Sequence, residues 1–175
     1  RQELLRGIGV DFVVFTKEVD ESYPDATPLR DVAPLLSLKK AKAFEDEELP
    51  ENYLVITADT VVVVGNEILG KPKDKDDAVR MLKALSGNVH EVVTGVTIHT
   101  KEMSRTFSVT SKVSFFSLVN EEIAYYIDKY RPYDKAGAYG VQEWIGFIGV
   151  NNVEGSYFNV MGLPTHRLYK ELKCF

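Results

Sequence analysis

The chain has 175 residues and a mass of 19.7 kDa, which fits one domain with a substantial core. Its formal net charge of −5 argues against a general nucleic-acid binder, which would present a basic face. The single cysteine, Cys174, cannot form an internal disulfide, and no apolar run reaches the ~20 residues of a membrane span. We therefore expect one cytoplasmic domain over 1–175, with neither nucleic acid nor membrane as a partner.

The first part of the chain predicts two helices around one strand. Apolar residues within 4–8 form a short helical stripe, and 11–16 follows as a predicted strand. Residues 20–34 are acidic and rich in turn-forming residues, and 35–44 then predicts a helix punctuated by lysines. A solvated acidic loop is expected at 45–52.

A β-hairpin is predicted in the middle of the chain. Residues 53–64 are almost continuously apolar, which is typical of a strand buried on both faces. Gly65 and Asn66 suit a two-residue turn, and 67–70 returns as the second arm.

The register of this hairpin decides which side chains meet at its open end. With a two-residue turn Val64 pairs with Glu67, and counting outward places Thr60 opposite Lys71. Asp59 is then a diagonal neighbour on the opposite face, whereas a turn one residue longer would put Asp59 and Lys71 on the same face. In either register a carboxylate, a hydroxyl and an ammonium gather there.

The rest of the chain alternates helices and strands. Asp74 predicts the N-cap of a helix, and Gly87 predicts its C-cap. Two strands, a helix that begins at its cap Asn120 and a closing helix follow, at 89–100, 105–116, 120–129 and 165–172. This order predicts an α/β domain with a mixed sheet.

The stretch GNEILGKP at 65–72 is one residue away from the phosphate-binding motif G-x-x-x-x-G-K-[ST]. Pro72 stands where that motif needs a hydroxyl, and it has no backbone N–H to offer a phosphate. Ile68 and Leu69 favour an extended backbone rather than one curled around an anion. The stretch is therefore not a P-loop, and we expect a hairpin instead.

Several blocks of the chain resemble, in order, the signature blocks of the Maf family of nucleoside triphosphate pyrophosphatases. They are VDES at 19–22, TADTVVVVGNEILGKPKD at 57–74, AVRMLKALSGNVHEVVTGV at 78–96, DKAGAYGVQ at 134–142 and GSYFNVMGLP at 155–164. The family's N-terminal block, a strand and a Ser-x-Ser-Pro-Arg-Arg loop, is matched by Arg1 alone. We therefore expect the rest of that block to lie upstream of these residues.

The resemblance implies a single Maf/ITPase-like domain, with helices packed around a mixed sheet. It implies hydrolysis of a nucleoside triphosphate to the monophosphate and pyrophosphate, which would clear unwanted nucleotides from the cellular pool. A divalent metal, Mg²⁺ or Mn²⁺, is implied as the cofactor. A homodimer is expected on the same ground.

The resemblance assigns catalytic roles to four residues, Asp59, Glu21, Lys40 and Lys71. Asp59 matches the acid of Ala-Asp-Thr, the implied general base or metal ligand, and Glu21 matches the acid of Asp-Glu-Ser. Carboxylate oxygens suit Mg²⁺ or Mn²⁺, so both acids are candidate metal ligands. Lys40 and Lys71 would neutralise phosphate oxygens. From spacing alone the simpler interpretation is that Asp59 caps a turn, that Glu21 belongs to a solvated acidic loop, and that Lys40 and Lys71 are surface cations.

Four further residues are implied to contact the substrate, namely Arg1, Thr60, Tyr139 and Gln142. Arg1, Thr60 and Gln142 match the branch of the family that acts on dTTP, UTP and related pyrimidine nucleotides. The amide of Gln142 also complements the donor–acceptor edge of thymine or uracil.

One departure concerns Glu143 and Trp144, which follow Gln142 where the family commonly has glycine. This leaves the shape of the base pocket open. A sister branch of the family prefers 7-methyl-GTP, and a non-catalytic regulator of septum formation is the alternative from another class of protein. The retained acids and lysines favour an enzyme, and a pyrophosphate-release assay would distinguish the three.

Overall fold

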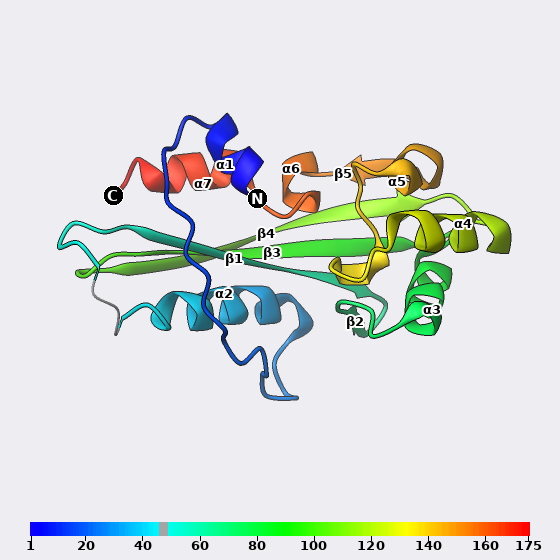
Figure 1. Ribbon diagram of the computed structural model, residues 1–175, viewed down its shortest axis with the longest axis horizontal. Coiled ribbons are helices and arrows are strands. Elements are labelled where there is room, and N and C mark those ends of the chain that lie inside the picture. Colours follow the sequence, from blue (N-terminus) through cyan, green and yellow to red (C-terminus); the bar gives the residue numbers. More distant parts are fainter. Residues whose placement is uncertain (46–48) are drawn as a thin grey trace.

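The computed structural model describes residues 1–45 and 49–175, so part of the acidic loop expected at 45–52 lies outside the described residues. Five strands form one sheet in the order β2-β1-β3-β4-β5 (Figure 1). The strands are β1 (Val55–Val64), β2 (Glu67–Leu69), β3 (Val89–His99), β4 (Ser104–Phe115) and β5 (Val150–Glu154). The helices are α1 (Gln2–Gly7), α2 (Val32–Lys42), α3 (Lys75–Leu85), α4 (Asn120–Tyr130), α5 (Trp144–Gly149), α6 (Tyr157–Val160) and α7 (Thr165–Leu172), with 3₁₀ turns η1 (Leu29–Asp31) and η2 (Ala136–Ala138).

Helices cover both faces of the sheet. In Figure 1, α2 lies below the long strands, α1, α6 and α7 lie above them, and α3 and α4 stand together at one end. The expected single α/β domain is confirmed. Every strand pairing within the described residues is antiparallel. The prediction of a mixed sheet is therefore wrong for this part of the chain.

The hairpin of β1 and β2 has the predicted register. Pairing begins at Val64 with Glu67, as a two-residue turn requires, and ends at Val62 with Leu69. Because β2 is so short, the part of β1 that carries Asp59 pairs only with β3 and has an open edge on its other side. This open edge is where the cavity described below is found.

Helix α2 lies close against the sheet because β3 has a glycine beneath it. A Cβ at Gly95 would lie 2.2 Å from the backbone nitrogen of Pro34, in the first turn of α2. Pro34 is tolerated there because the first-turn N–H groups of a helix have no partner within the helix. Val32 packs with Val61 and Val93 in the buried cluster between α2 and the sheet. The close approach brings the far end of α2, which carries Lys40, to the open edge of β1.

Residues 11–16, predicted as a strand, are not one in the structure. Val13 and Phe15 are 78% and 64% exposed, and within the described residues the segment has no strand partner. A strand needs such a partner for its backbone hydrogen bonds, so the apolar composition of 11–16 was not enough. The segment runs instead from α1 to the α2 side of the sheet (Figure 1).

Several helix boundaries also differ from prediction. Helix α2 begins at Val32, before the predicted start at residue 35. The N-cap of α4 is Val119 rather than Asn120, and Glu122 accepts the Val119 amide proton at 2.9 Å. The C-cap of α3 is Ser86, followed by Gly87 at a φ of 68°. None of the described helices is long and apolar enough to cross a bilayer.

Candidate active site

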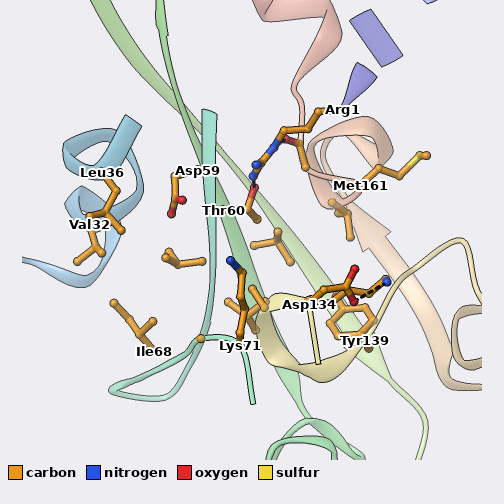
Figure 2. A pocket seen from close by; sticks show the side chains of 18 of the residues that line it. Arg1, Val32, Leu36, Asp59, Thr60, Ile68, Lys71, Asp134, Tyr139 and Met161 are labelled. Atoms are coloured by element: carbon orange, nitrogen blue, oxygen red, sulfur yellow. Dashed lines mark hydrogen bonds and ion pairs between the residues drawn. The ribbon is translucent and has the colours of Figure 1, made fainter. Parts of the chain in front are cut away.

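A cavity of about 710 Å³ lies at the open edge of β1. All eight residues singled out from the sequence line it, from six separate parts of the chain: Arg1, Glu21, Lys40, Asp59, Thr60, Lys71, Tyr139 and Gln142. Asp59 and Thr60 are consecutive on β1 and point to opposite faces of the sheet, yet both reach the cavity because it lies at the edge of the sheet (Figure 2). The cavity thus lies beyond the last pair of the hairpin, at the open end where the hairpin register had gathered Asp59, Thr60 and Lys71. Along β1 it lies beside the middle of the strand, whereas a position at the end of the strand had been expected.

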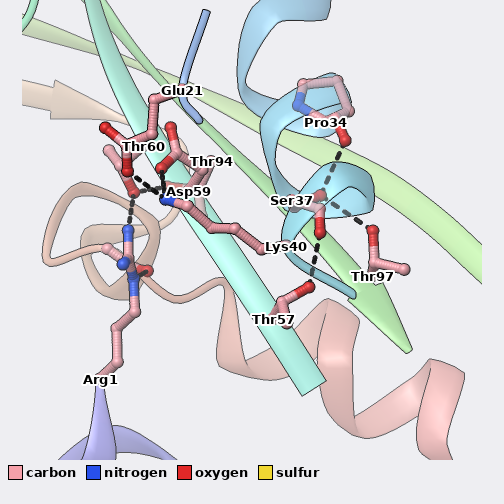
Figure 3. Close-up of polar contacts among 11 residues, drawn as sticks. Arg1, Glu21, Pro34, Ser37, Lys40, Thr57, Asp59, Thr60, Thr94 and Thr97 are labelled. Atoms are coloured by element: carbon pink, nitrogen blue, oxygen red, sulfur yellow. Dashed lines mark hydrogen bonds and ion pairs between the residues drawn. The ribbon is translucent and has the colours of Figure 1, made fainter. Parts of the chain in front are cut away.

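The ammonium of Lys40 lies between two carboxylates (Figure 3). Its Nζ is 2.8 Å from Oε1 of Glu21 and 2.5 Å from Oδ1 of Asp59. The side chain of Asp59 is only 14% exposed, whereas that of Glu21 is 51% exposed. Helix α2, strand β1 and the segment before α2 therefore each contribute one charge to the same point.

This contact shifts the pKa values of Glu21 and Lys40. The hydrogen bond from Lys40 lowers the pKa of Glu21 below its ordinary value, although burial acts in the opposite direction. Burial lowers the pKa of the Lys40 ammonium, but its bonds to Asp59 and Glu21 outweigh this, so that pKa is raised. A charged Lys40 and an ionised Glu21 follow at neutral pH.

On the other face of β1, a hydroxyl and a backbone carbonyl hold the guanidinium of Arg1. Its Nη2 donates to Oγ1 of Thr60 at 2.9 Å, and its Nε donates to the carbonyl of Gly162 at 2.8 Å. The hydroxyl of Thr94 donates to the carbonyl of Asn159 at 3.2 Å and is 2.9 Å from Oγ1 of Thr60. Since each hydroxyl has one proton, Thr60 donates to Thr94 and is left with lone pairs for Arg1.

Lys71 differs from Lys40 in its surroundings. Within the part of the chain that the structure describes, its ammonium makes no ion pair or side-chain hydrogen bond, so it is available to an anion in the cavity. The adjacent Gly70 carbonyl accepts from the amide of Gly137 at 3.0 Å. This bond ties the segment 134–142 to the hairpin. The ladder that would pair Lys71 with Thr60 is not continued beyond Leu69, although both residues line the cavity.

Tyr139 and Gln142 reach the cavity from the segment 134–142. The hydroxyl of Tyr139 forms a hydrogen bond of 2.7 Å with Nε2 of His90, so its ring rather than its hydroxyl is available to a ligand. Asp134 and Lys135 also line the cavity, and they were not singled out from the sequence. Both residues lie within the block DKAGAYGVQ, so the resemblance that pointed to Tyr139 and Gln142 could also have pointed to them.

Comparison with known proteins places this cavity in a family. A family model described as Maf-like protein matches residues 1–175. The chain belongs to the Maf family. Similar proteins named dTTP/UTP pyrophosphatase occur in Bacteroides fragilis strain YCH46 (51% identical, over 99% of this chain and 90% of the relative) and Parabacteroides distasonis (49%, 100% and 91%). A further dTTP/UTP pyrophosphatase, from Flavobacterium psychrophilum, is 47% identical over 97% of this chain and 86% of the relative.

Two carboxylates of this Maf protein fit a divalent cation, namely Glu21 and Asp59, whose oxygens meet at Lys40. Mg²⁺ is usually held by one or two carboxylates together with substrate phosphates and water. Within residues 1–45 and 49–175, no group of three or more His, Cys, Asp or Glu is arranged to hold a metal. The donor set therefore suits a cation that shares the oxygens of a bound phosphate.

Proposed function

We propose that this Maf protein hydrolyses pyrimidine nucleoside triphosphates, dTTP and UTP, to the monophosphate and pyrophosphate. The observation that carries the proposal is the Lys40 ammonium between Glu21 and Asp59, in a cavity that also holds Lys71 and Arg1. Together with Lys135 and Asp134, this lining has four cations and three acids, which suits a polyanion that is cleaved by water. Relatives that are about 50% identical to this chain over nearly its whole length are named dTTP/UTP pyrophosphatase, which supports the same activity.

In the proposed reaction, water adds across the bond between the α- and β-phosphates, and the pyrophosphate leaves. Asp59 takes the proton of the attacking water as general base. Lys71 and Arg1 bind the oxygens of the triphosphate tail, and Lys40 exchanges its carboxylate partners for phosphate oxygens, which frees Asp59 for this role. A divalent cation held by Glu21 and Asp59 would supply a more acidic bound water and neutralise phosphate charge.

The base is proposed to lie against the segment 134–142. There Gln142 lines the cavity, and its amide can offer one donor and one acceptor to the edge of thymine or uracil. The ring of Tyr139, 6% exposed, closes this part of the cavity beside it. A preference for pyrimidines follows from this pairing.

A pyrophosphate-release assay on the purified protein with Mg²⁺ tests the proposal. We expect turnover of dTTP and UTP above that of 7-methyl-GTP and the common purine triphosphates. A preference for 7-methyl-GTP would replace the pyrimidine assignment, and no release from any triphosphate would favour a non-catalytic role in cell division. The expected homodimer and cytoplasmic location remain predictions, which sedimentation and fractionation would test.

A further inference from the structure

We propose that Glu143 is a positioning residue, which holds the segment 134–142 in the shape that presents Gln142 to the base. The proposal rests on the proposed function, because it concerns how the cavity selects its nucleotide. Glu143 does not line the cavity itself, and it acts through Lys135 and Tyr126.

The first contact closes the segment on itself. Oε1 of Glu143 is 3.2 Å from Nζ of Lys135, and these side chains are 22% and 27% exposed. Tyr139, Gly140 and Gln142, which line the cavity, all lie between these two positions in the chain. The ion pair therefore fixes both ends of the stretch that faces the substrate.

The second contact anchors the segment to helix α4. Tyr126 is 0% exposed, its hydroxyl donates to Oε2 of Glu143, and it accepts from the amide of Gly140 at 3.0 Å. Burial and the bond to Glu143 raise the pKa of Tyr126, so the hydroxyl keeps its proton and remains a donor. One buried phenol thus holds the middle and the end of the segment together.

The backbone of the segment needs such support. Gly137 and Ala138 have φ values of 69° and 58°, and the left-handed region is unfavourable for alanine. A Cβ at Gly140 would lie 3.0 Å from Cε of Lys135 and 3.1 Å from Cδ of Glu143, so the chain passes directly over the ion pair. Without Glu143 the segment loses one of its supports, the one that contacts both Lys135 and Tyr126.

Three variants separate the contacts. Glu143→Ala removes both, Tyr126→Phe removes the bonds to Glu143 and Gly140, and Glu143→Gln keeps an acceptor for Tyr126 but loses the charge that faces Lys135. We expect the first two to raise KM for dTTP and UTP about tenfold, the size of one lost charged hydrogen bond, with kcat close to that of the parent. Their selectivity over GTP should fall, and Glu143→Gln should recover part of both losses.

Glu122→Ala is the matched control. Glu122 lies on the same helix as Tyr126 and accepts from the Val119 amide, but it does not line the cavity. Its removal should lower the melting temperature without changing KM or selectivity. If Glu143→Ala behaved like this control, with a lower melting temperature and unchanged KM and selectivity, the positioning role would be overturned.

Failure of the proposed function can be told apart from failure of this inference. If the parent protein releases no pyrophosphate, the catalytic assignment falls. Calorimetric titration with a non-hydrolysable dTTP analogue then measures the positioning effect directly. Glu143→Ala should raise the Kd of the analogue by the same factor, and an unchanged Kd would contradict the inference.

Discussion

Lys40 and Asp59 form an ion pair across the open edge of the sheet, with 2.5 Å between Nζ and Oδ1. The two residues come from different elements, α2 and β1, and each compensates the charge of the other. A triphosphate that enters the cavity competes with Asp59 for Lys40, because its oxygens carry the same sign of charge. In this arrangement substrate binding itself would release the carboxylate that we propose as the general base.

Replacement of Asp59 tests that role directly. Asp59→Asn keeps the size of the side chain but removes the proton acceptor, so kcat for pyrophosphate release should fall by about 10³-fold. The fold should persist, because Lys40 keeps Glu21 as a partner. Asp25→Asn, at an exposed acid in the turn-rich segment, is the matched control and should keep full turnover. Equal turnover in both variants would remove Asp59 from the mechanism.

Lys71 is expected to contribute to binding more than to turnover. Lys71→Ala should raise KM for dTTP by roughly 10- to 100-fold, the range for a lost hydrogen bond to a charged group. Lys73→Ala provides the comparison, since Lys73 is exposed and does not line the cavity. Steady-state kinetics measure the KM for dTTP of both variants. A KM for Lys71→Ala equal to that of Lys73→Ala would argue against phosphate binding by Lys71.

Metal binding should depend on the nucleotide. Because Glu21 and Asp59 offer few ligands on their own, Mn²⁺ should bind the free protein weakly and bind at least about tenfold more tightly with a non-hydrolysable dTTP analogue. Electron paramagnetic resonance of Mn²⁺ gives both affinities without any turnover. Mn²⁺ also binds the analogue in the absence of protein. The affinity of that binding is measured separately, and the titration with protein is corrected for it. Tight binding to the protein alone would indicate further protein ligands.

His90 should make stability depend on pH. Burial lowers the pKa of His90 to about 4, whereas an unfolded histidine has a pKa of about 6.5. Between these values the unfolded chain takes up a proton that the folded one excludes, so stability falls as pH drops from about 6.5 to 4, by about 3 kcal/mol in total. The titratable group that contacts His90 is Tyr139, whose pKa is raised by burial and which therefore stays neutral.

Urea unfolding at several pH values between 7 and 4 measures this dependence. His90→Gln should be less stable than the parent at pH 7, and the difference should shrink as pH falls. His166→Gln, at an exposed position on α7, should instead follow the parent at every pH. A constant difference between His90→Gln and the parent across the range would show that His90 does not cause the effect.

Gly95 is expected to be intolerant of even one added methyl group. In Gly95→Ala the new Cβ would meet backbone atoms of Pro34 and Ala33 at 2.2 and 2.4 Å, so α2 would have to move away from the sheet. We expect a loss of about 3 kcal/mol in urea unfolding and reduced turnover, because α2 carries Lys40. Gly7→Ala is the control, since its Cβ would meet nothing within 4 Å. Full activity in Gly95→Ala would mean that α2 can shift without moving Lys40 from the site.

Local sequence signals predicted the hairpin and its register, because a Gly-Asn turn fixes the pairing of Val64 with Glu67. They failed at 11–16, since exposed side chains such as Phe15 give a strand pattern whether or not a partner edge exists. The hairpin register brought Asp59, Thr60 and Lys71 together, whereas the other cavity residues could be collected only through resemblance to a family. Their actual contacts, such as the hydroxyl chain from Thr60 to Thr94, depend on the register between β1 and β3, which no local pattern specifies.

The bond between Arg1 and the carbonyl of Gly162 joins positions 161 residues apart in the chain. During synthesis on the ribosome the central strands can pair early, since neighbours in the sheet are mostly neighbours in sequence. The candidate site cannot form completely until the segment around Gly162 has emerged. A nascent or clipped chain that has its sheet but lacks this segment would therefore be expected to leave nucleotides intact, so that activity would report a chain that extends through Gly162.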